Sequence, residues 1–417
     1  MTVELLIFIL ELVKTLLSVL TTGICLYQIS IAIFTLKRPL SYKPLIDKKH
    51  RFAIVIAARN EQDVIGYLID SLHAQNYPRE LFDVYVIADN CTDDTASVAR
   101  NHGATAYERF NSTLVGKGHA LHWMFDIMMK ETPDQYDAVC IFDADNLVDG
   151  DYLLEMNRQL CAGTTIAQGY RDVKNPTDNW VSGGYTIYWM TLTRLYHIPR
   201  NNIGFSAMVS GTGFMFRTDI LVENGGWHTH SLCEDSEFSL LSIAQGHKIV
   251  LARKAIFYDE QPTSFPQSLR QRYRWAVGNL QCIKYCLPSL VKSLFTKGNA
   301  LAVDAILYLL SIPCIFLAAL NALIQLFIYS TNIQIFFASI PSALLAIIVS
   351  YLVLMAQGLL VLILEKRPIR PMGVALLTYP ISVVSWMAIS FISLFYQNVS
   401  WKPIAHTKKI SIEQLKR

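Results

Sequence analysis

The sequence predicts an α/β domain with a mostly parallel, Rossmann-like sheet, joined to transmembrane helices on both sides. Between residues 51 and 263, short apolar runs alternate with helix-like segments, as they do in parallel sheets covered on both faces. Long runs without charged side chains stand before and after this stretch, which is typical of membrane-spanning helices. The composition agrees, because 52% of the 417 residues are hydrophobic and 17% are charged, against about 25% charged residues in ordinary soluble domains.

Three apolar runs are expected to form neighbouring strands: residues 52–57, 84–88 and 139–142. Helix-like patterns follow the first two, over residues 61–75 and 95–102. Open parallel sheets of this kind have right-handed crossovers and bind ligands beyond the carboxyl ends of their strands. None of these strands is followed by a GxGxxG pattern or a Walker-type glycine loop, so a dinucleotide-binding fold and a P-loop NTPase are both disfavoured.

The first apolar run, residues 15–36, carries no charged side chain and has about the length that one membrane-spanning helix needs. Lys37 and Arg38 follow at once, so the positive-inside rule places the next domain in the cytosol. A cleavable signal peptide is the alternative. It is disfavoured by the two acids Glu4 and Glu11 before the run and by the lack of a small-residue cleavage site.

This first helix also carries a polar stripe. Five of its residues fall near one helical face: Glu4, Glu11, Thr15, Ser18 and Thr22. Polar side chains are costly against lipid, so we expect the stripe to pack on other helices or to line a polar path.

Two further apolar stretches follow the α/β domain. No Asp, Glu, Lys or Arg occurs between Asp304 and Glu365, a length that holds two spans with a turn at residues 330–332, and a third span fits in residues 371–401. The chain is thus divided into a first helix and linker (1–50), a cytosolic domain (51–263), amphipathic interface helices (264–300), about three transmembrane helices with a cytosolic segment near 365–371 (301–401), and a basic tail (402–417).

The tail conflicts with this count of spans. Four spans place both termini outside the cell, whereas basic residues prefer the cytosol. The basic residues of the tail are Lys402, Lys408, Lys409, Lys416 and Arg417. Either the last apolar run re-enters without crossing, or one span is miscounted, and the sequence leaves both open.

Acidic residues stand at the ends of two predicted strands. Asp143-Ala-Asp145 directly follows one strand, and two carboxylates so placed can hold a hard divalent cation together with a diphosphate. Asp89 follows the neighbouring strand and is expected to face the same crevice. Its alternative role is that of a helix N-cap, which we assign instead to the turn residues 92–94.

A glycine-flanked lysine, Lys117, precedes another helical stretch. The glycines allow close backbone approach, and the amine can reach a diphosphate as a point charge. The alternative is an ordinary loop with a solvated lysine.

Two adjacent acids, Glu234 and Asp235, begin an amphipathic helix. A carboxylate at this place can act as the general base on an incoming hydroxyl group. We assign the base to Asp235 and keep Glu234 as the alternative. Helix capping explains one acid of this pair, but not two.

A later helix is expected to carry Gln271, Arg274 and Trp275 on one face, because they are three and four residues apart. The arginine can stabilise a departing diphosphate, and the indole can offer an aromatic face to a sugar ring. The alternative is an amphipathic helix on anionic lipid, with Arg270, Arg272 and Arg274 as its basic side. Both roles can hold at once.

The sequence gives little indication of nucleic-acid binding or of a structural zinc site. The net charge of +3 is too small to indicate nucleic-acid binding, and we expect no nucleic-acid partner. The eight cysteines show no pairing pattern, and Cys282 and Cys286 lack nearby ligands that would complete a zinc site. Reduced thiols in a cytosol-facing protein are expected.

The ordered set Asp89, Asp143-Ala-Asp145, Glu234-Asp235 and Gln271-x-x-Arg274-Trp275 resembles the signature of processive family 2 glycosyltransferases, such as cellulose, hyaluronan, chitin and poly-N-acetylglucosamine synthases. The resemblance extends from about Arg51 to the end of the chain. It implies a GT-A domain on the cytosolic face of the plasma membrane in a multi-pass protein, a UDP-sugar donor, and Mg²⁺ or Mn²⁺.

The resemblance also implies a role for each matching residue. The implied catalytic residues are Asp235, Glu234 and Arg274, and the implied metal ligands are Asp143 and Asp145. Nucleotide-sugar contacts are implied for Ala58, Asn60, Glu61, Asp89, Lys117, Asp143, Gln271, Arg274 and Trp275, and acceptor contacts for Gly211, Thr212, Gly213 and Trp275.

The implied function is inverting polymerisation of a β-linked polysaccharide from UDP-N-acetylglucosamine or UDP-glucose, with passage of the glycan across the membrane past aromatic residues such as Trp386. Cys233 stands where cellulose-type enzymes commonly have threonine, so the sugar is not fixed by this motif. No PilZ domain follows the last span, and regulation would need an accessory membrane or regulatory subunit. Membrane lipids and the growing glycan are the other expected partners.

Two rival functions remain. A non-processive transferase that adds one sugar to a membrane lipid would share the acidic residues, but the complete QxxRW motif and the three following spans favour the polymerase. A transport or scaffold protein with an inactive transferase domain is disfavoured because every expected acid is present.

Overall fold

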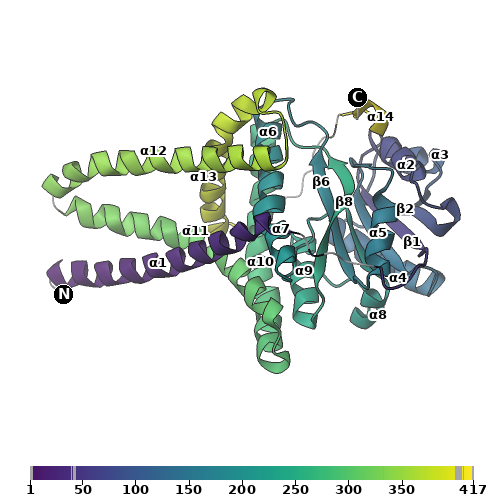
Figure 1. The fold of residues 1–417 in the computed structure, drawn as a ribbon, viewed down its shortest axis with the longest axis horizontal. Coiled ribbons are helices and arrows are strands. Elements are labelled where there is room, and N and C mark those ends of the chain that lie inside the picture. Colours follow the sequence, from purple (N-terminus) through teal and green to yellow (C-terminus); the bar gives the residue numbers. More distant parts are fainter. Residues whose placement is uncertain are drawn as a thin grey trace.

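The computed structural model describes residues 3–38, 40, 44–331, 333–399, 406 and 408–415. It contains an eight-stranded sheet with helices on both faces and a set of long helices that extend away from the sheet (Figure 1). The strand order is β3-β2-β1-β4-β7-β6-β8-β5. The strands are β1 (Phe52–Ala58), β2 (Phe82–Asp89), β3 (Thr105–Arg109), β4 (Ala138–Asp143), β5 (Leu147–Val148), β6 (Ile166–Val173), β7 (Phe214–Arg217) and β8 (Ile249–Asp259).

The first half of the sheet is parallel, as the sequence predicts. β1 pairs in parallel with β2 and β4, and β2 pairs in parallel with β3. β7 is antiparallel to both β4 and β6, whereas β6 and β8 are again parallel. The prediction of a mostly parallel sheet is confirmed, and the antiparallel β7 marks where the two halves join.

The apolar runs form strands because both faces of the sheet are covered. Along β1, Phe52, Ile54 and Ile56 pack into one core cluster, and Ala53 and Val55 pack into the other. Side chains of a strand alternate between its faces, so a strand between two helical layers has to be apolar at every position.

The helices of the catalytic domain are α2 (Ile65–His73), α3 (Thr95–Asn101), α4 (Lys117–Glu131), α5 (Tyr152–Cys161), α6 (Trp180–Thr191), the π-helix η3 (Leu192–His197), α7 (Ile198–Asn202), α8 (Asp219–Asn224) and α9 (Glu234–Gln245). The helix expected from Glu61 begins later, at Ile65. The reason is local: Asn60 has a left-handed φ of 57°, and the Glu61 N–H donates to Thr95 Oγ1 at 2.8 Å. The turn after β1 is therefore held against the turn after β2.

The long helices are α1 (Val3–Ala32), α10 (Phe265–Lys297), α11 (Ala300–Ser330), α12 (Ile333–Leu364) and α13 (Gly373–Phe395), and the short α14 (Ile412–Leu415) lies in the tail. Among the described residues, three helices are long and apolar enough to cross a membrane, Glu4–Leu36, Gln334–Leu364 and Arg370–Phe395, and the bent pair Ala300–Ser311 and Phe316–Ser330 would make a fourth.

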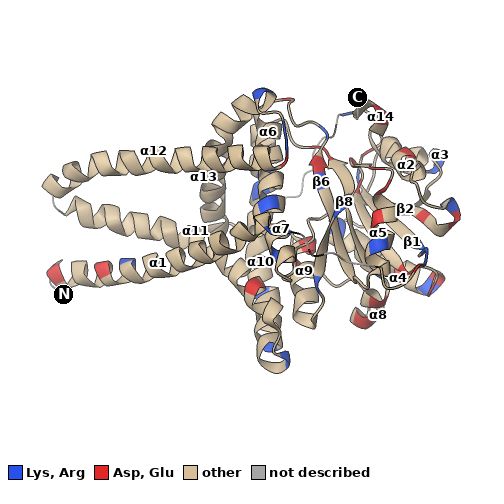
Figure 2. Ribbon diagram, in the orientation of Figure 1, with Lys and Arg blue, Asp and Glu red and all other residues tan. Residues whose placement is uncertain are grey.

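These helices do not all run in the same direction. α1, α11 and α12 extend away from the sheet, whereas α13 runs across them and packs on α6 and α10 (Figure 1). Charged side chains lie mostly on the catalytic domain, and along α12 the ribbon carries none (Figure 2).

α1 packs on α11. Asn321 Nδ2 donates to Ser18 Oγ at 2.8 Å, and Lys14 Nζ, outside the predicted stripe, donates to Gln325 Oε1 at 2.8 Å. The expectation that the polar stripe packs on another helix is confirmed at Ser18, whereas Thr15 and Thr22 of the stripe are exposed.

The tail packs on the catalytic domain. Lys408 Nζ lies 2.8 Å from Asp178 Oδ1, and Lys409 Nζ lies 2.8 Å from Asp63 Oδ1. Lys402, Lys416 and Arg417 lie outside the described residues. The tail and the catalytic domain are therefore on the same side of the helices that extend from the sheet.

A buried ion pair fastens the catalytic domain to the long helices. The guanidinium of Arg200, on α7, is fully buried and donates to both carboxylate oxygens of Asp304, on α11, at 2.9 and 3.0 Å. It also donates to Gln28 Oε1 on α1 at 2.8 Å, and Tyr27 OH donates to Asp304 at 2.7 Å. Three elements distant in sequence meet at this one network.

Removing one partner of this pair is expected to be costly. Arg200→Met leaves the buried Asp304 carboxylate without its cation, and a buried pair broken in this way typically loses about 3–5 kcal/mol. The measurement is the unfolding free energy of the detergent-solubilised protein. Lys48→Ala is the control, because it removes an exposed pair with Asp137 that is expected to be worth at most about 1 kcal/mol. The double variant Arg200→Met/Asp304→Leu should regain part of the loss, and no recovery would contradict the argument.

Candidate active site

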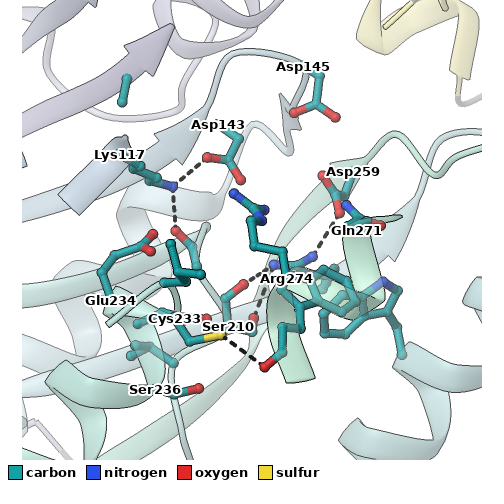
Figure 3. Close-up of a pocket in the computed structure, with 18 of the residues that line it drawn as sticks. Lys117, Asp143, Asp145, Ser210, Cys233, Glu234, Ser236, Asp259, Gln271 and Arg274 are labelled. Carbon is teal, nitrogen blue, oxygen red and sulfur yellow. Dashed lines mark hydrogen bonds and ion pairs between the residues drawn. The ribbon is translucent and has the colours of Figure 1, made fainter. Parts of the chain in front are cut away.

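One continuous cavity of about 350 Å³ runs from the carboxyl ends of β1, β2 and β4 to the helices α6, α10 and α13. Most of the residues that the sequence predicts for the site line it (Figure 3). They are Ala58, Glu61, Asp89, Lys117, Asp143, Asp145, Gly211, Glu234, Asp235, Gln271, Arg274 and Trp275. Residues from four distant parts of the chain thus share one space.

Three residues of the predicted set do not line the cavity. Asn60 Oδ1 accepts from the Thr92 N–H at 2.8 Å and so holds a turn. Thr212 is fully buried, and its hydroxyl accepts from the Asp143 N–H at 2.8 Å. A Cβ at Gly213 would lie 2.1 Å from the ring of Phe257. The structure places these residues in the wall of the site, where they set its shape.

Lys117 lies between two sides of the cavity. Its amine pairs with the Asp143 carboxylate and donates to the Gly211 carbonyl oxygen at 2.7 Å (Figure 3). Burial opposes the charged amine, but Asp143 and Glu234 outweigh burial and raise the pKa of Lys117. It therefore stays cationic inside the cavity.

Asp145 is buried, and its carboxylate accepts from the Glu260 N–H at 3.1 Å. Burial raises the pKa of Asp145 to about 8, and the negative charges of Asp259 and Asp143 act in the same direction. A carboxylate in this place is stabilised by a cation beside it.

His406, from the tail, reaches this acidic end. Its Nδ1 lies 2.9 Å from Glu61 Oε1, and its Nε2 lies 3.8 Å from Asp145 Oδ2. The sequence analysis missed this residue, since a single histidine beyond the last apolar run gives no sign of its partner. Only the return of the chain to the catalytic domain brings it here.

The acidic end fits a hard divalent cation. Within the part of the chain that the structure describes, no three His, Cys, Asp or Glu side chains form a complete metal site by themselves. Asp143 and Asp145 both line the cavity, and carboxylate oxygens are the ligands that Mg²⁺ and Mn²⁺ prefer. Mg²⁺ usually completes its shell with water and substrate phosphate oxygens, so two carboxylates suffice.

Asp89 is held by an arginine that the sequence analysis missed. Arg109 Nη1 lies 2.5 Å from Asp89 Oδ1, and both side chains are buried. Arg109 Nη2 also donates to the Leu114 carbonyl oxygen at 2.8 Å. Asp94, within the predicted residues 92–94, is the N-cap residue of α3 but makes no side-chain capping hydrogen bond, while Asp93 Oδ1 accepts from the Thr95 N–H at 3.1 Å.

The two adjacent acids begin α9, as predicted. Cys233, just before them, packs so closely on α10 that a Cβ at Gly278 would lie 2.5 Å from its sulfur. Burial raises the pKa of Asp235 and raises the pKa of Glu234 to about 7. A Cβ built on Gly211 would lie 3.4 Å from Asp235 Oδ2, so Gly211 leaves the space in front of this carboxylate open.

The raised pKa of Glu234 predicts how stability depends on pH. The folded protein binds this proton up to about pH 7, whereas glutamates of an unfolded chain release theirs near pH 4.3. The stability that comes from protonated Glu234 is complete below the lower value and is lost as pH rises through the higher one. Glu234→Gln, which cannot ionise, is expected to unfold at a higher temperature than the wild type at pH 8, with no difference at pH 4.

Thermal unfolding in detergent at the two pH values checks this prediction. The exposed Glu80 provides the control substitution Glu80→Gln. An equal shift at pH 4 and pH 8 would contradict the assignment to ionisation of Glu234.

α10 presents the predicted face to the cavity. Pro266 stands in its first turn, and Tyr185 OH donates to Gln271 Oε1 at 2.8 Å. Arg272 is buried and donates to Ser385 Oγ on α13 at 2.8 Å. The alternative of a lipid-facing basic side is therefore wrong for Arg272, which binds another helix of the same chain.

The far end of the cavity is aromatic. The rings of Trp275 and Trp386 are stacked, with centroids 6.2 Å apart and planes at 20°, and Tyr188 lies 6.3 Å from Trp386. Tyr188, Trp189, Tyr196 and Tyr308 line this end too, and the sequence analysis named none of them. These aromatic residues come from separate parts of the chain, so the sequence does not show that they form one cluster.

Arg171 joins the two ends of the cavity and was also missed. It pairs with Asp259 at 2.8 Å, donates to the Ser210 carbonyl oxygen, and lies 3.9 Å from the ring centroid of Trp189. It is thereby fixed beside the loop that carries Gly211.

A mostly parallel sheet with paired carboxylates beyond one strand, at the edge of a cavity, is typical of a GT-A-like α/β fold. The family model of "Glycosyltransferase like family 2" matches residues 50–278, and the chain belongs to this family.

Similar proteins agree with this family. "Probable glycosyltransferase YdaM" of Bacillus subtilis is 22% identical over 376 residues, which cover 83% of each chain. "Beta-monoglucosyldiacylglycerol synthase" of Nostoc is 26% identical over 58% of this chain and 52% of its own length. "4,4'-diaponeurosporenoate glycosyltransferase" of Staphylococcus aureus is 39% identical over 22% of this chain and 24% of its own length.

Among solved structures, the mannosyltransferase PcManGT of Pyrobaculum calidifontis, in complex with GDP-Man and Mn²⁺, covers 93% of this chain and 98% of its own chain with a TM-score of 0.62. Sequence identity is 18%, so this similarity concerns the fold.

Proposed function

We propose that the chain is a membrane-bound, inverting glycosyltransferase that extends a β-linked glycan from a UDP-sugar. The observation that carries this proposal is the cavity, which joins an acidic end suited to a nucleotide diphosphate with an aromatic end bordered by α10, α11 and α13. UDP-N-acetylglucosamine and UDP-glucose are the proposed donors.

The acidic end would bind the donor. Asp89, fixed by Arg109, would accept a hydrogen bond from the nucleoside, and Lys117 and Arg274 would bind the diphosphate. Asp143 and Asp145 would hold Mg²⁺ or Mn²⁺. A divalent cation bound there would supply charge neutralisation for the departing UDP.

The transfer itself would use Asp235. Its carboxylate would take the proton of an acceptor hydroxyl, and that oxygen would form a bond to the anomeric carbon while the bond from this carbon to the UDP oxygen breaks. Attack opposite to the leaving group converts an α-linked donor into a β-linked product. Arg274 would stabilise the charge that grows on the diphosphate.

The aromatic end favours a glycan acceptor. Trp275 and Trp386 offer ring faces, which suit the C–H face of a sugar. The second candidate is transfer of one sugar to a membrane lipid, and it is favoured by the names of several relatives, among them three beta-monoglucosyldiacylglycerol synthases.

We also propose a membrane arrangement. α1, α11 and α12 would cross the bilayer, and α13, which packs on α6 and α10, would lie along its cytosolic surface. This arrangement returns the tail to the side of the catalytic domain, where Lys408 and Lys409 bind it, and it removes the conflict with the positive-inside rule. A tag after Arg417 is expected to be accessible only from the cytosol.

Product analysis tests the proposal. The purified full-length protein is supplied with UDP-glucose or UDP-N-acetylglucosamine and Mg²⁺ or Mn²⁺. A high-molecular-weight product that a β-glycosidase digests is expected. A lipid carrying a single sugar would establish the second candidate instead. Absence of UDP release with every UDP-sugar would contradict the proposed donor class.

A further inference from the structure

Asn279 stands one turn beyond the QxxRW motif on the same face of α10. Gln271, Trp275 and Asn279 are spaced four residues apart, so they share one side of the helix, and all three line the cavity. Four residues advance a helix by about 6 Å, roughly the length of one sugar unit. The position beyond Trp275 is therefore one sugar further along the acceptor path.

The Asn279 side chain has an unused hydrogen-bond acceptor. Its Oδ1 is buried and has no hydrogen-bond partner among the described residues. Leaving a buried carbonyl oxygen unpaired costs free energy, and native structures pair the large majority of such groups. Asn279 itself lines the cavity, so a turn of its amide would offer this oxygen to a ligand hydroxyl.

Further hydroxyl groups lie at the same end. Tyr196 and Tyr308 line the cavity, with ring centroids 5.3 Å apart. Within the described chain, the phenol hydroxyls of these two tyrosines form no hydrogen bond with another residue. They can donate or accept, which suits a ligand with several hydroxyl groups.

The cavity residues contributed by η3, α11 and α13 are Leu192, Tyr196, His197, Tyr308 and Trp386, and none carries an acidic or permanently cationic side chain. The cations that line the cavity come from other elements: Lys117 and Arg171 are paired with Asp143 and Asp259, and Arg270 and Arg274 lie on α10. An uncharged sugar beside η3, α11 and α13 would find ring faces and polar atoms.

We infer that Asn279, Tyr196 and Tyr308 form a second acceptor subsite, which binds an uncharged sugar unit through a hydroxyl that donates to Asn279 Oδ1. This inference rests on the proposed function. The sugar unit belongs either to a growing glycan or to the headgroup of a glycolipid. Both present the same uncharged, hydroxyl-bearing ring to this site.

The test compares acceptor use with donor use. Full-length Asn279→Ala and Tyr308→Phe are assayed with UDP-glucose and cellotetraose, or with UDP-N-acetylglucosamine and chitotetraose. The KM for the tetrasaccharide is expected to rise roughly tenfold in Asn279→Ala, as for loss of one hydrogen bond in a buried site. The KM for the UDP-sugar and the slow hydrolysis of the donor without acceptor should not change.

Two further variants sharpen the comparison. Asn279→Asp keeps an acceptor oxygen and should hold the tetrasaccharide KM closer to that of the wild type. Lys284→Ala, an exposed position on the same helix, should leave every constant unchanged. An unchanged tetrasaccharide KM in Asn279→Ala, or an equal rise in both KM values, would overturn the subsite while wild-type transfer keeps the proposed function intact.

Lipid acceptors separate the two sources of the sugar. If the wild type uses only lipids, Asn279→Ala should slow transfer to glucosyldiacylglycerol vesicles more than transfer to diacylglycerol vesicles. Equal slowing of the two would overturn the subsite. A wild type that releases no UDP from any donor would refute the proposed function and the subsite together.

Discussion

Asp235→Asn is expected to lower the turnover number about 10³-fold, because general-base catalysis by a positioned side chain contributes roughly 10²–10⁴. The amide has the shape of the carboxylate but cannot take the acceptor proton. The affinity for the UDP-sugar should change little, since Gly211, for which we propose an acceptor contact, stands in front of this carboxylate, whereas Asp89, for which we propose a donor contact, does not. Steady-state kinetics with separate titrations of donor and acceptor make the measurement.

The dependence of activity on pH tests the same assignment of Asp235 as the general base. The base has to be ionised, and burial raises the pKa of Asp235 above the ordinary value for aspartate. Activity is therefore expected to fall as pH decreases through this raised value, at a higher pH than for an exposed aspartate. Asp235→Asn should lose this acid limb from its residual activity.

Glu234→Gln is the matched control for the choice between the two acids. Glu234 lies on the side of Lys117, across the site from Asp259 and Gln271 (Figure 3), and the positive charges of Lys117 and Arg274 act on it. Its loss should affect donor binding more than turnover. A 10³-fold loss in Glu234→Gln together with a mild effect in Asp235→Asn would reverse the roles.

The sequence predicts the parallel half of the sheet because local pattern decides it. β1, β2 and β4 are buried on both faces along most of their length, so each contains an uninterrupted apolar run that identifies it as a strand. The acids at their ends then follow from the geometry of parallel sheets. β7, in contrast, is only four residues long, and it pairs antiparallel with β4, which is distant in sequence. No local sequence pattern predicts this pairing.

The residues of the site likewise divide into those that a local motif predicts and those that matter through contacts with distant residues. Asp143 and Asp235 are found by motif, since each lies next to a strand or helix that the pattern reveals. The sequence does not reveal Arg109 and His406, because each matters through a distant partner: Arg109 binds Asp89, 20 residues away, and His406 binds Glu61, 345 residues away. It does not reveal Asn279 either, because what marks this residue is a side-chain oxygen without a hydrogen-bond partner in the described chain. Sequence spacing carries no information about such contacts.

Chelation of divalent cations, or Asp145→Asn, is expected to remove nearly all activity, because a metal ion contributes several kcal/mol to charge stabilisation in a transfer of this kind. The substitution should not destabilise the fold. Burial raises the pKa of Asp145, so ionising this carboxyl group costs free energy in the folded protein, and the neutral asparagine of the same shape avoids that cost. Loss of activity with an unchanged unfolding temperature is the expected combination.

Binding of the metal has a readout that does not depend on turnover. In the presence of UDP, added Mn²⁺ should raise the unfolding temperature of the wild type, because a ligand that binds the folded state stabilises it by mass action. Asp145→Asn should show no such rise, whereas Asp151→Asn, at an exposed acid outside the cavity, should behave as the wild type. A wild-type protein that keeps full activity in chelator, or an Asp145→Asn variant that Mn²⁺ still stabilises, would show that these carboxylates do not hold a metal. Asp145 would then serve only to bind the Glu260 N–H and the tail at His406.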